Sequence, residues 1–469
     1  MSNIGLFDEF SPVTAKQWKQ KIQFDLKGAD YNDTLVWESL EGIKTKPFYH
    51  SEDLEGLKTS HLPKNHGWNI AQGIYAADAG KANIKALDVL KKGVESLVFT
   101  IPNEKTDFAK LLNGIDLENT PLHFNFQFLA VEPIKKLLAY LGDKTCQVHL
   151  NIDLIGNLAR SGNWFHTLEK DHAVLEEINA ITSQKTSIGT IGVDLSLYQN
   201  AGANKVQQLA YGLAQANEYL NHFVTSSARL LDRQAVEKFP ITFKVAVGGN
   251  YFFEIAKLRA LRWLWNSLAQ EYGIESDCHI LAMPTKRNKT VYDYNVNLLR
   301  TTSECMSAIL GGADTVCNLP YDAIYHKDNE FGERIARNQL LLLKEESYFK
   351  EASQISEGTY CIESLTEQLA EKALNLFKQV EKSGGFLDAL KKGTIQQKIK
   401  ESAAKEQQLF DEGKMVLLGT NKYQNPQDRM KDDLELYPFV KTQPRKTLLE
   451  PIIEKRLAET LEQKRLNDE

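Results

Sequence analysis

The sequence lacks the features that mark secreted, membrane-bound or nucleic-acid-binding proteins. No apolar run approaches the roughly 20 residues that span a bilayer, and the N-terminus has no basic region followed by an apolar core. The formal net charge of −6 offers no general basic surface to a phosphate backbone. The five cysteines are widely spaced and form no CxxC pair, which favours reduced thiols over a disulfide or zinc framework. We therefore expect a cytoplasmic protein that binds neither membranes nor nucleic acids.

Motifs for phosphate and metal binding are also missing. The glycine pairs Gly248-Gly249, Gly311-Gly312 and Gly384-Gly385 stand at expected strand or helix ends, and none belongs to a G-x-G-x-x-G pattern or a P-loop. His61 and His66 lie in an irregular segment without an acidic or thiol partner in a ligand pattern. The sequence therefore predicts no metal site.

Short β-rich apolar runs alternate with longer helical stretches through the middle of the chain. At 42% hydrophobic and 25% charged residues, the composition is that of a globular protein. We predict eight strands, at residues 68–74, 96–101, 122–128, 146–152, 190–197, 241–247, 279–284 and 314–319. Helical runs such as 200–221, 252–272 and 290–310 separate them. Eight consecutive βα units over about 250 residues indicate the α/β class and a closed (β/α)₈ TIM barrel.

Two of the predicted strands alternate polar and apolar residues. The polar residues are His123, Asn125 and Gln127 in one strand, and Gln147, His149, Asn151 and Asp153 in and just after the other. A period of two places each polar set on one face. Because helices cover the outside of a barrel, we expect the polar faces to line its interior. A passage for a polar ligand and a buried hydrogen-bond network are both compatible with such a lining.

The segments that flank the barrel differ from it in character. We divide the chain into an N-terminal arm (1–65), the barrel (66–350) and a C-terminal helical extension (351–469). The arm contains one expected helix, Thr14–Leu26, and then an irregular stretch with exposed-looking apolar residues. Such a surface suits subunit association, although the arm could instead fold back on its own barrel.

The C-terminal extension carries two further helical patterns. A turn at Gly358 precedes a helix that is expected to end near Lys382, before the break at Gly384-Gly385. Mixed charge over 447–465 predicts a final helix that faces solvent.

Several blocks of sequence are specific to one enzyme family. They are EFSPVTAKQWKQKIQFDLKGADYNDTLVWESLEGI, YFFEIAKLRALRWLWN, RTTSECMSAILGGADTV, ERIARNQLLLLKEESY and EGTYCIESLT. From Phe10 to Tyr423 the chain resembles, in register, the adenosylcobalamin-dependent acyl-CoA mutases of the methylmalonyl-CoA mutase family. The resemblance implies a barrel that threads the CoA tail and an arm that wraps another subunit. It also implies a following cobalamin-binding domain, which we expect this chain to lack because it ends soon after MVLLGTNKY.

The positions at which the family carries its chemistry are degenerate here. The catalytic tyrosine of the family motif R-Q-Y-A-G-F-S-T aligns with Gly73, and the histidine of G-Y-H-M-Q-E-A-G-A aligns with Leu197. The family's carboxylate-binding arginine aligns with Ala173. None of these three residues can hold a radical intermediate, donate to a thioester carbonyl or pair with a carboxylate, so we expect no catalytic residue. A shifted alignment would bring in Tyr75 or Tyr198.

The cobalamin-binding pattern D-x-H-x-x-G is not completed either. The one D-x-H is Asp277-Cys278-His279, and Ala282 follows where the pattern has glycine. We expect His279 to lie in the barrel and this chain to bind no cofactor.

The resemblance therefore implies the small (beta) subunit of a heterodimeric methylmalonyl-CoA mutase. Its partner would be a large (alpha) catalytic subunit that binds adenosylcobalamin and interconverts (R)-methylmalonyl-CoA and succinyl-CoA. This chain alone would be inactive. One alternative is the catalytic chain of a split mutase with cobalamin on a separate small chain. Another is a scaffold that binds a CoA ester without mutase activity.

Overall fold

The computed structural model describes residues 9–56, 67–183, 185, 187–226, 239–275, 277–351, 355–441 and 444–469. His61 and His66, named above for the absence of a metal pattern, lie outside these residues. No helix within the described ranges is long and apolar enough to cross a membrane.

Eight parallel strands close into a barrel in the order β10-β3-β4-β5-β6-β7-β8-β9. The strands are β3 (Asn69–Tyr75), β4 (Ser96–Ile101), β5 (Leu122–Phe126), β6 (Val148–Ile152), β7 (Ile188–Asp194), β8 (Ile241–Val247), β9 (His279–Pro284) and β10 (Thr315–Cys317). Each strand falls within two residues of its predicted start, and the predicted (β/α)₈ TIM barrel is confirmed.

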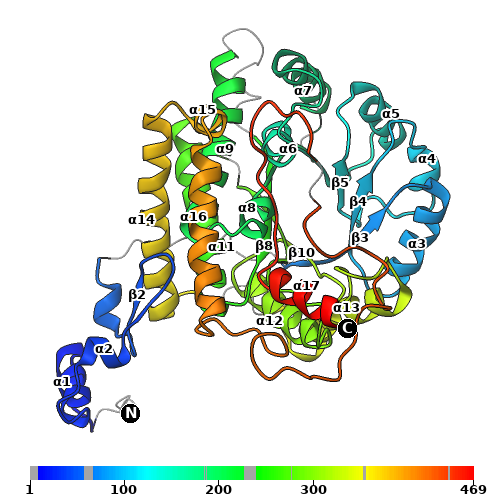
Figure 1. Cartoon of the computed structure of the whole chain (residues 1–469). Helices are drawn as coiled ribbons and strands as arrows, with labels where there is room; N and C mark the ends of the chain where they lie inside the picture. Colours follow the sequence, from blue (N-terminus) through cyan, green and yellow to red (C-terminus); the bar gives the residue numbers. More distant parts are fainter. Residues whose placement is uncertain are drawn as a thin grey trace, which may run out of the picture.

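Helices alternate with the strands and surround the barrel (Figure 1). They are α3 (Ala79–Lys91), α4 (Phe108–Leu111), α5 (Val131–Leu141), α6 (Leu154–Ser161), α7 (Leu168–Thr182), α8 (Ser196–Asn200), α9 (Lys205–Ser226), α11 (Tyr251–Glu271), α12 (Val296–Leu310), α13 (Glu330–Leu341) and the π-helical turn η2 (Leu342–Glu346). The outward residues of the strands, such as Leu97, Phe99 and Phe124, are fully buried under these helices. Period-two alternation therefore leaves the polar residues of the same strands to face inward.

A second layer of helices covers one side of the barrel. Helices α14 (Tyr360–Lys382), α15 (Phe386–Lys391) and α16 (Thr394–Asp411) stand beside α9 and α11 in Figure 1. The predicted helix from Gly358 to Lys382 corresponds to α14.

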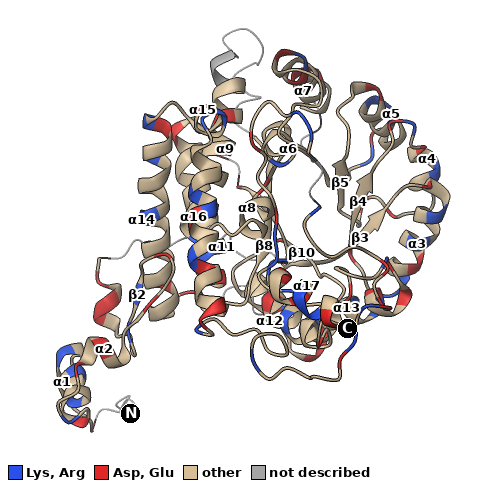
Figure 2. Ribbon diagram, viewed as in Figure 1, with Lys and Arg blue, Asp and Glu red and all other residues tan. Residues whose placement is uncertain are grey.

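Helix α11, the block YFFEIAKLRALRWLWN, is buried between the barrel and α14. Its charged residues are paired inside the protein: Lys257 contacts Glu254 at 2.5 Å, and Arg259 contacts Glu363 of α14 at 2.5 Å. Arg262 is also only 2% exposed. On the outer helices α14 and α16, Figure 2 shows basic and acidic residues interspersed rather than one basic face.

The N-terminal arm projects from the body (Figure 1). It contains α1 (Ala15–Asp25), which Thr14 caps and which corresponds to the predicted helix Thr14–Leu26, then α2 (Tyr31–Leu35), the hairpin β1 (Trp37–Glu38) and β2 (Lys44–Thr45), and the 3₁₀ turn η1 (Ser51–Leu54). The hairpin touches the body, since the Trp37 ring lies 5.8 Å from that of Phe253 in α11. Helix α1 has no buried residue and exposes Trp18 and Phe24.

The final helix, α17 (Glu459–Asp468), begins later than predicted. The predicted helix over 447–465 is wrong in its first half, where the chain is extended and Ile452 donates its N–H to the Ala159 carbonyl of α6 at 2.8 Å. The predicted solvent-facing charge is right only in part: Lys464 and Asp468 are exposed, but Glu462 is fully buried and pairs with Arg456 at 2.7 Å.

Candidate functional site

The carboxyl ends of strands β4 to β8 surround a cavity of about 410 Å³. In a TIM barrel this end is the one at which ligand sites form. The polar residues that line it are Thr100, Asn125, Gln127, Asn151, Asp153, Asn157, Arg160, Asp194, Thr242 and Lys244. The predicted polar interior is therefore present, and it includes four of the residues named from the sequence, Asn125, Gln127, Asn151 and Asp153.

Two cations and one carboxylate give this cavity its electrostatic character. Asp194, at the end of β7, lies 2.9 Å from Arg160 and 3.1 Å from Lys244. Burial alone would raise the pKa of this carboxyl, but Lys244 and Arg160, with a hydrogen bond from Ser196, lower it to about 2. The second arm of Arg160 contacts Glu454 at 2.8 Å. Both cations are thus already paired with carboxylates of the same chain.

Asp153 fixes the loop between β6 and α6 beside the cavity. Its carboxylate caps α6 by accepting the Gly156 N–H at 2.8 Å, and it also accepts from the Tyr219 hydroxyl at 2.8 Å. The Asp194 N–H donates to the other oxygen at 3.0 Å, so the loops after β6 and β7 are held together. Burial raises the pKa of Asp153, although these hydrogen bonds oppose it. The sequence prediction placed Asp153 among the lumen residues, and the structure gives it this capping role at the cavity edge.

The extended C-terminal segment runs along the carboxyl side of the barrel. Its N–H groups donate to Ala159 of α6, to Asn200 of α8 from Lys455, and to the Arg287 carbonyl, beyond β9, from Leu457. In Figure 1 it descends past α6 toward α17. The segment therefore covers part of the barrel mouth with the chain's own backbone.

Beneath the cavity the barrel is filled. His123 and Leu281 are fully buried, and Val98 and His149 are 4% and 7% exposed. These inward side chains come from β4, β5, β6 and β9: Val98 and Leu281 belong to one buried apolar cluster, and the rings of His123 and His149 lie 4.4 Å apart. A chain-like ligand could pass only if they were displaced.

The structure separates the three degenerate positions. Gly73 lies on the inward face of β3, and a Cβ atom there would be 4.0 Å from Cys317 Sγ. Leu197 is fully buried at the start of α8, close after β7. Ala173 lies on the exposed side of α7, outside the cavity lining. The first two positions thus flank the barrel mouth, and Ala173 does not.

The two tyrosines of the shifted alignment also differ in placement. Tyr75 follows Gly73 on the same face of β3 and is 53% exposed at the barrel rim. Tyr198 is fully buried, and its hydroxyl donates to Gln215. Tyr198 is therefore a core residue that cannot reach a ligand in the cavity.

The described residues do not fit a cobalt-bound cofactor. His279 of the single D-x-H sequence lies inside the barrel, with its ring 4.1 Å from that of His149. Asp277 accepts a hydrogen bond from Arg262 at 2.9 Å and so points to α11 rather than to His279. A lower ligand of cobalamin must project toward a corrin ring, whereas His279 points into the barrel toward His149 and contacts the Thr315 hydroxyl.

Sequence reasoning missed the charged group Arg160, Asp194 and Lys244. A signal for part of it was present, since Lys244 interrupts the apolar strand ITFKVAV at an inward position and Asp194 ends its strand. Asp194 and Lys244 are close because β7 and β8 are neighbouring strands of the barrel, and their register places these two residues side by side.

Comparison with known proteins agrees with the geometry. The family model described as methylmalonyl-CoA mutase matches residues 88–465. The chain is 35% identical to the methylmalonyl-CoA mutase small subunit of Porphyromonas gingivalis, over 90% of this chain and 71% of that protein. It is 27% identical to the small subunit of Streptomyces virginiae, over 90% and 72%. It is 26% identical to the large subunit of the same organism, over 90% and 64%. The chain belongs to the methylmalonyl-CoA mutase family.

Proposed function

We propose that this chain is the small, non-catalytic subunit of a heterodimeric, adenosylcobalamin-dependent methylmalonyl-CoA mutase of the cytoplasm. In this role it supports a large subunit that interconverts (R)-methylmalonyl-CoA and succinyl-CoA. The observation that carries the proposal is the filled barrel interior. Where the family resemblance implies a path for the CoA tail, this chain has the packed side chains of His123, Leu281 and Val98.

The residues at the barrel mouth support the same role. Gly73 has no side chain to hold a radical intermediate, and Leu197 is a core residue without a donor. The cations of the cavity, Arg160 and Lys244, are bound to Asp194 and Glu454. A substrate carboxylate would therefore have to compete with two internal carboxylates.

Two further observations support a heterodimer. Small and large subunits are both named among the relatives from one organism. In this chain Trp18 and Phe24 of α1 are 50% and 78% exposed on a projecting arm. Apolar side chains displayed in this way suit burial against a partner.

The test is co-expression of this chain with the large mutase chain of its own organism. We expect a one-to-one complex with adenosylcobalamin that turns over methylmalonyl-CoA, whereas this chain alone does not. The arm variant Trp18→Ala with Phe24→Ala should weaken the complex. The matched variant Ile84→Ala, which removes an equally exposed apolar side chain from α3, should not.

Other outcomes would overturn the proposal. Turnover by this chain with a short cobalamin-binding protein would establish the split mutase. Tight binding of a CoA ester, without any mutase partner, would establish the scaffold.

A further inference from the structure

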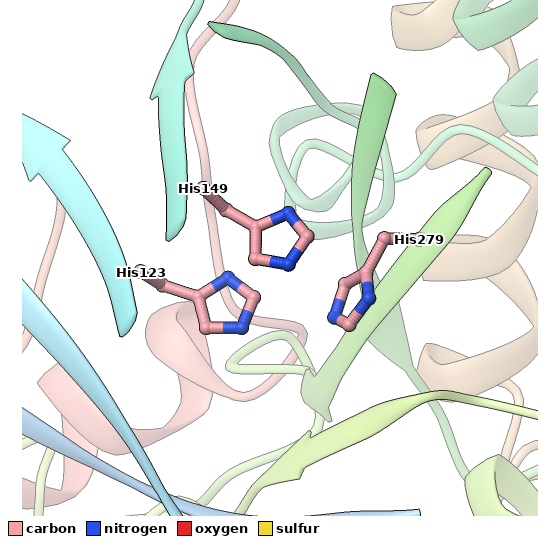
Figure 3. Close-up of side chains that lie close together, drawn as sticks. All are labelled: His123, His149 and His279. Carbon is pink, nitrogen blue, oxygen red and sulfur yellow. The ribbon is translucent and has the colours of Figure 1, made fainter. Parts of the chain in front are cut away.

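Three histidines from different strands meet inside the barrel. His123 lies on β5, His149 on β6 and His279 on β9, and Figure 3 shows their rings turned toward one another. One ligand nitrogen from each lies within 4.8 Å of the other two. Strands β6 and β9 are not neighbours in the sheet, so barrel closure creates this histidine cluster.

Three ring nitrogens of the histidine cluster have no hydrogen-bond partner in the part of the chain that the structure describes. Neither ring nitrogen of His123 has a hydrogen-bond partner among the described residues, and the same holds for Nε2 of His149. His123 is fully buried, so bulk water does not satisfy it. Buried polar atoms without a partner reduce stability and are uncommon in folded proteins. These nitrogens are therefore available to bind a ligand that does not come from the described residues.

Two threonine hydroxyls contact ring nitrogens of His149 and His279 and fix the orientation of these rings. Nδ1 of His149 lies 2.8 Å from the Thr242 hydroxyl, and Nε2 of His279 lies 3.1 Å from the Thr315 hydroxyl. When these nitrogens donate to the hydroxyls, the opposite nitrogen of each ring keeps its lone pair for a ligand. Burial also lowers the pKa of all three imidazoles, to about 4 for His149, so the rings are neutral at pH 7.

We propose that His123, His149 and His279 bind a divalent transition-metal ion, and that the ion is zinc. Three neutral imidazoles form a donor set that zinc accepts, with a fourth position open to water or another ligand. Thr242 lines the cavity and contacts His149, so the cavity gives the ion a path to the site. No metal site was expected from the sequence, because the three histidines lie on separate strands and form no local metal-binding motif. The inference does not depend on the proposed mutase role.

Binding would change the arrangement of the rings. The His123 and His149 rings are stacked at 8° with centroids 4.4 Å apart, and those of His149 and His279 are tilted at 37°. A tetrahedral zinc ion with Zn–N distances of about 2.0–2.1 Å holds its ligand nitrogens about 3.3 Å apart. A nitrogen lone pair lies in the plane of its ring, so His123 must turn out of the stack to reach the same ion as His149.

The experiment uses the full chain, dialysed against a weak chelator and then titrated with zinc. We expect close to one tightly held zinc per chain. Thr242→Val should weaken zinc binding about 10- to 100-fold because it removes only the orienting hydroxyl. His123→Phe should weaken it further. His123 has no hydrogen bond to lose within the described ranges, and phenylalanine keeps a ring in the stack, so this variant should fold. His50→Gln, on the arm, should bind zinc as the unaltered chain does.

A structural measurement decides the case independently of the variants. Crystals soaked in zinc should show anomalous density between the three rings, with His123 rotated out of the stack. Cobalt(II) at the site should give the visible absorption of a tetrahedral nitrogen-ligated ion. Ordered water without anomalous density, or zinc binding that His123→Phe leaves unchanged, would overturn the proposal.

Discussion

The ion pair between α11 and α14 offers a direct test of how the outer helices are held on the barrel. Arg259 and Glu363 have side chains 0% and 3% exposed, and their nearest atoms are 2.5 Å apart. The same carboxylate oxygen accepts the Gly358 N–H at 2.8 Å, ahead of α14. Glu363→Gln keeps the size and one acceptor but removes the charge. We predict that it lowers the free energy of unfolding by about 3 to 5 kcal/mol, because the buried guanidinium loses the carboxylate that it contacts at 2.5 Å.

The assay is urea unfolding followed by far-ultraviolet circular dichroism. Glu371→Gln, on the exposed side of the same helix, serves as the control and should change stability by less than about 0.5 kcal/mol. Arg259→Met combined with Glu363→Leu should recover most of the loss, since an apolar pair of similar volume replaces the buried charges. A loss of less than about 1 kcal/mol in Glu363→Gln would refute the reasoning, because that is the range of a solvated surface pair.

Three further predictions concern the barrel mouth. Leu197→Ala should lower the free energy of unfolding by about 2 to 5 kcal/mol in the same urea assay, since it leaves a cavity at a fully buried position. A stable Leu197→Ala would contradict its placement in the core. Because Lys244 and Arg160 lower the pKa of Asp194 to about 2, its stabilisation of about 2 kcal/mol should be complete above about pH 4 and be lost as the pH falls toward 2. Acid unfolding of Asp194→Asn should accordingly show a shallower dependence over that interval. Arg160→Met should speed hydrogen exchange at the Ile452 amide, because the contact of Arg160 with the C-terminal segment is lost.

The barrel was predictable because its sequence pattern is local. Each strand is a short apolar or alternating run, and helices on the outside require the apolar side to face outward. The positions of His123 and Asn125 inside the barrel followed from the same alternation. Strand ends were less predictable: β6 has an irregular register between His149 and Ile152, and Asn151 adopts a positive φ of 46°.

Features that depend on distant contacts were not predictable. The segment before α17 has mixed charge, which is typical of a solvated helix, but Pro451 and the hydrogen bonds to α6 keep it extended. Glu462 and Arg456 are buried there because they form an ion pair with each other. Glu462 also accepts a hydrogen bond from the Val291 N–H. Likewise, the helical run predicted over 252–272 gave no sign that the charged residues of α11 are buried. In each case the partner lies too far along the chain for a local pattern to show.

The ion pairs and packed side chains of the barrel differ from the exposed apolar surface of the arm, and this difference bears on the proposed role of the chain. At the barrel mouth the cations are neutralised internally, and below it packed side chains close the lumen. The outer layer is instead joined to the barrel helices by buried ion pairs such as Arg259–Glu363, which links α11 to α14. Among the described residues of the arm, Phe24 is the most exposed large apolar side chain, at 78%, and its helix has no buried residue. A barrel with packed side chains in its interior and an arm with exposed apolar side chains fits the proposed supporting role better than a substrate-binding one. In the proposed heterodimer, loss of the arm should therefore reduce the stability of the assembly before it alters the chemistry of the large subunit.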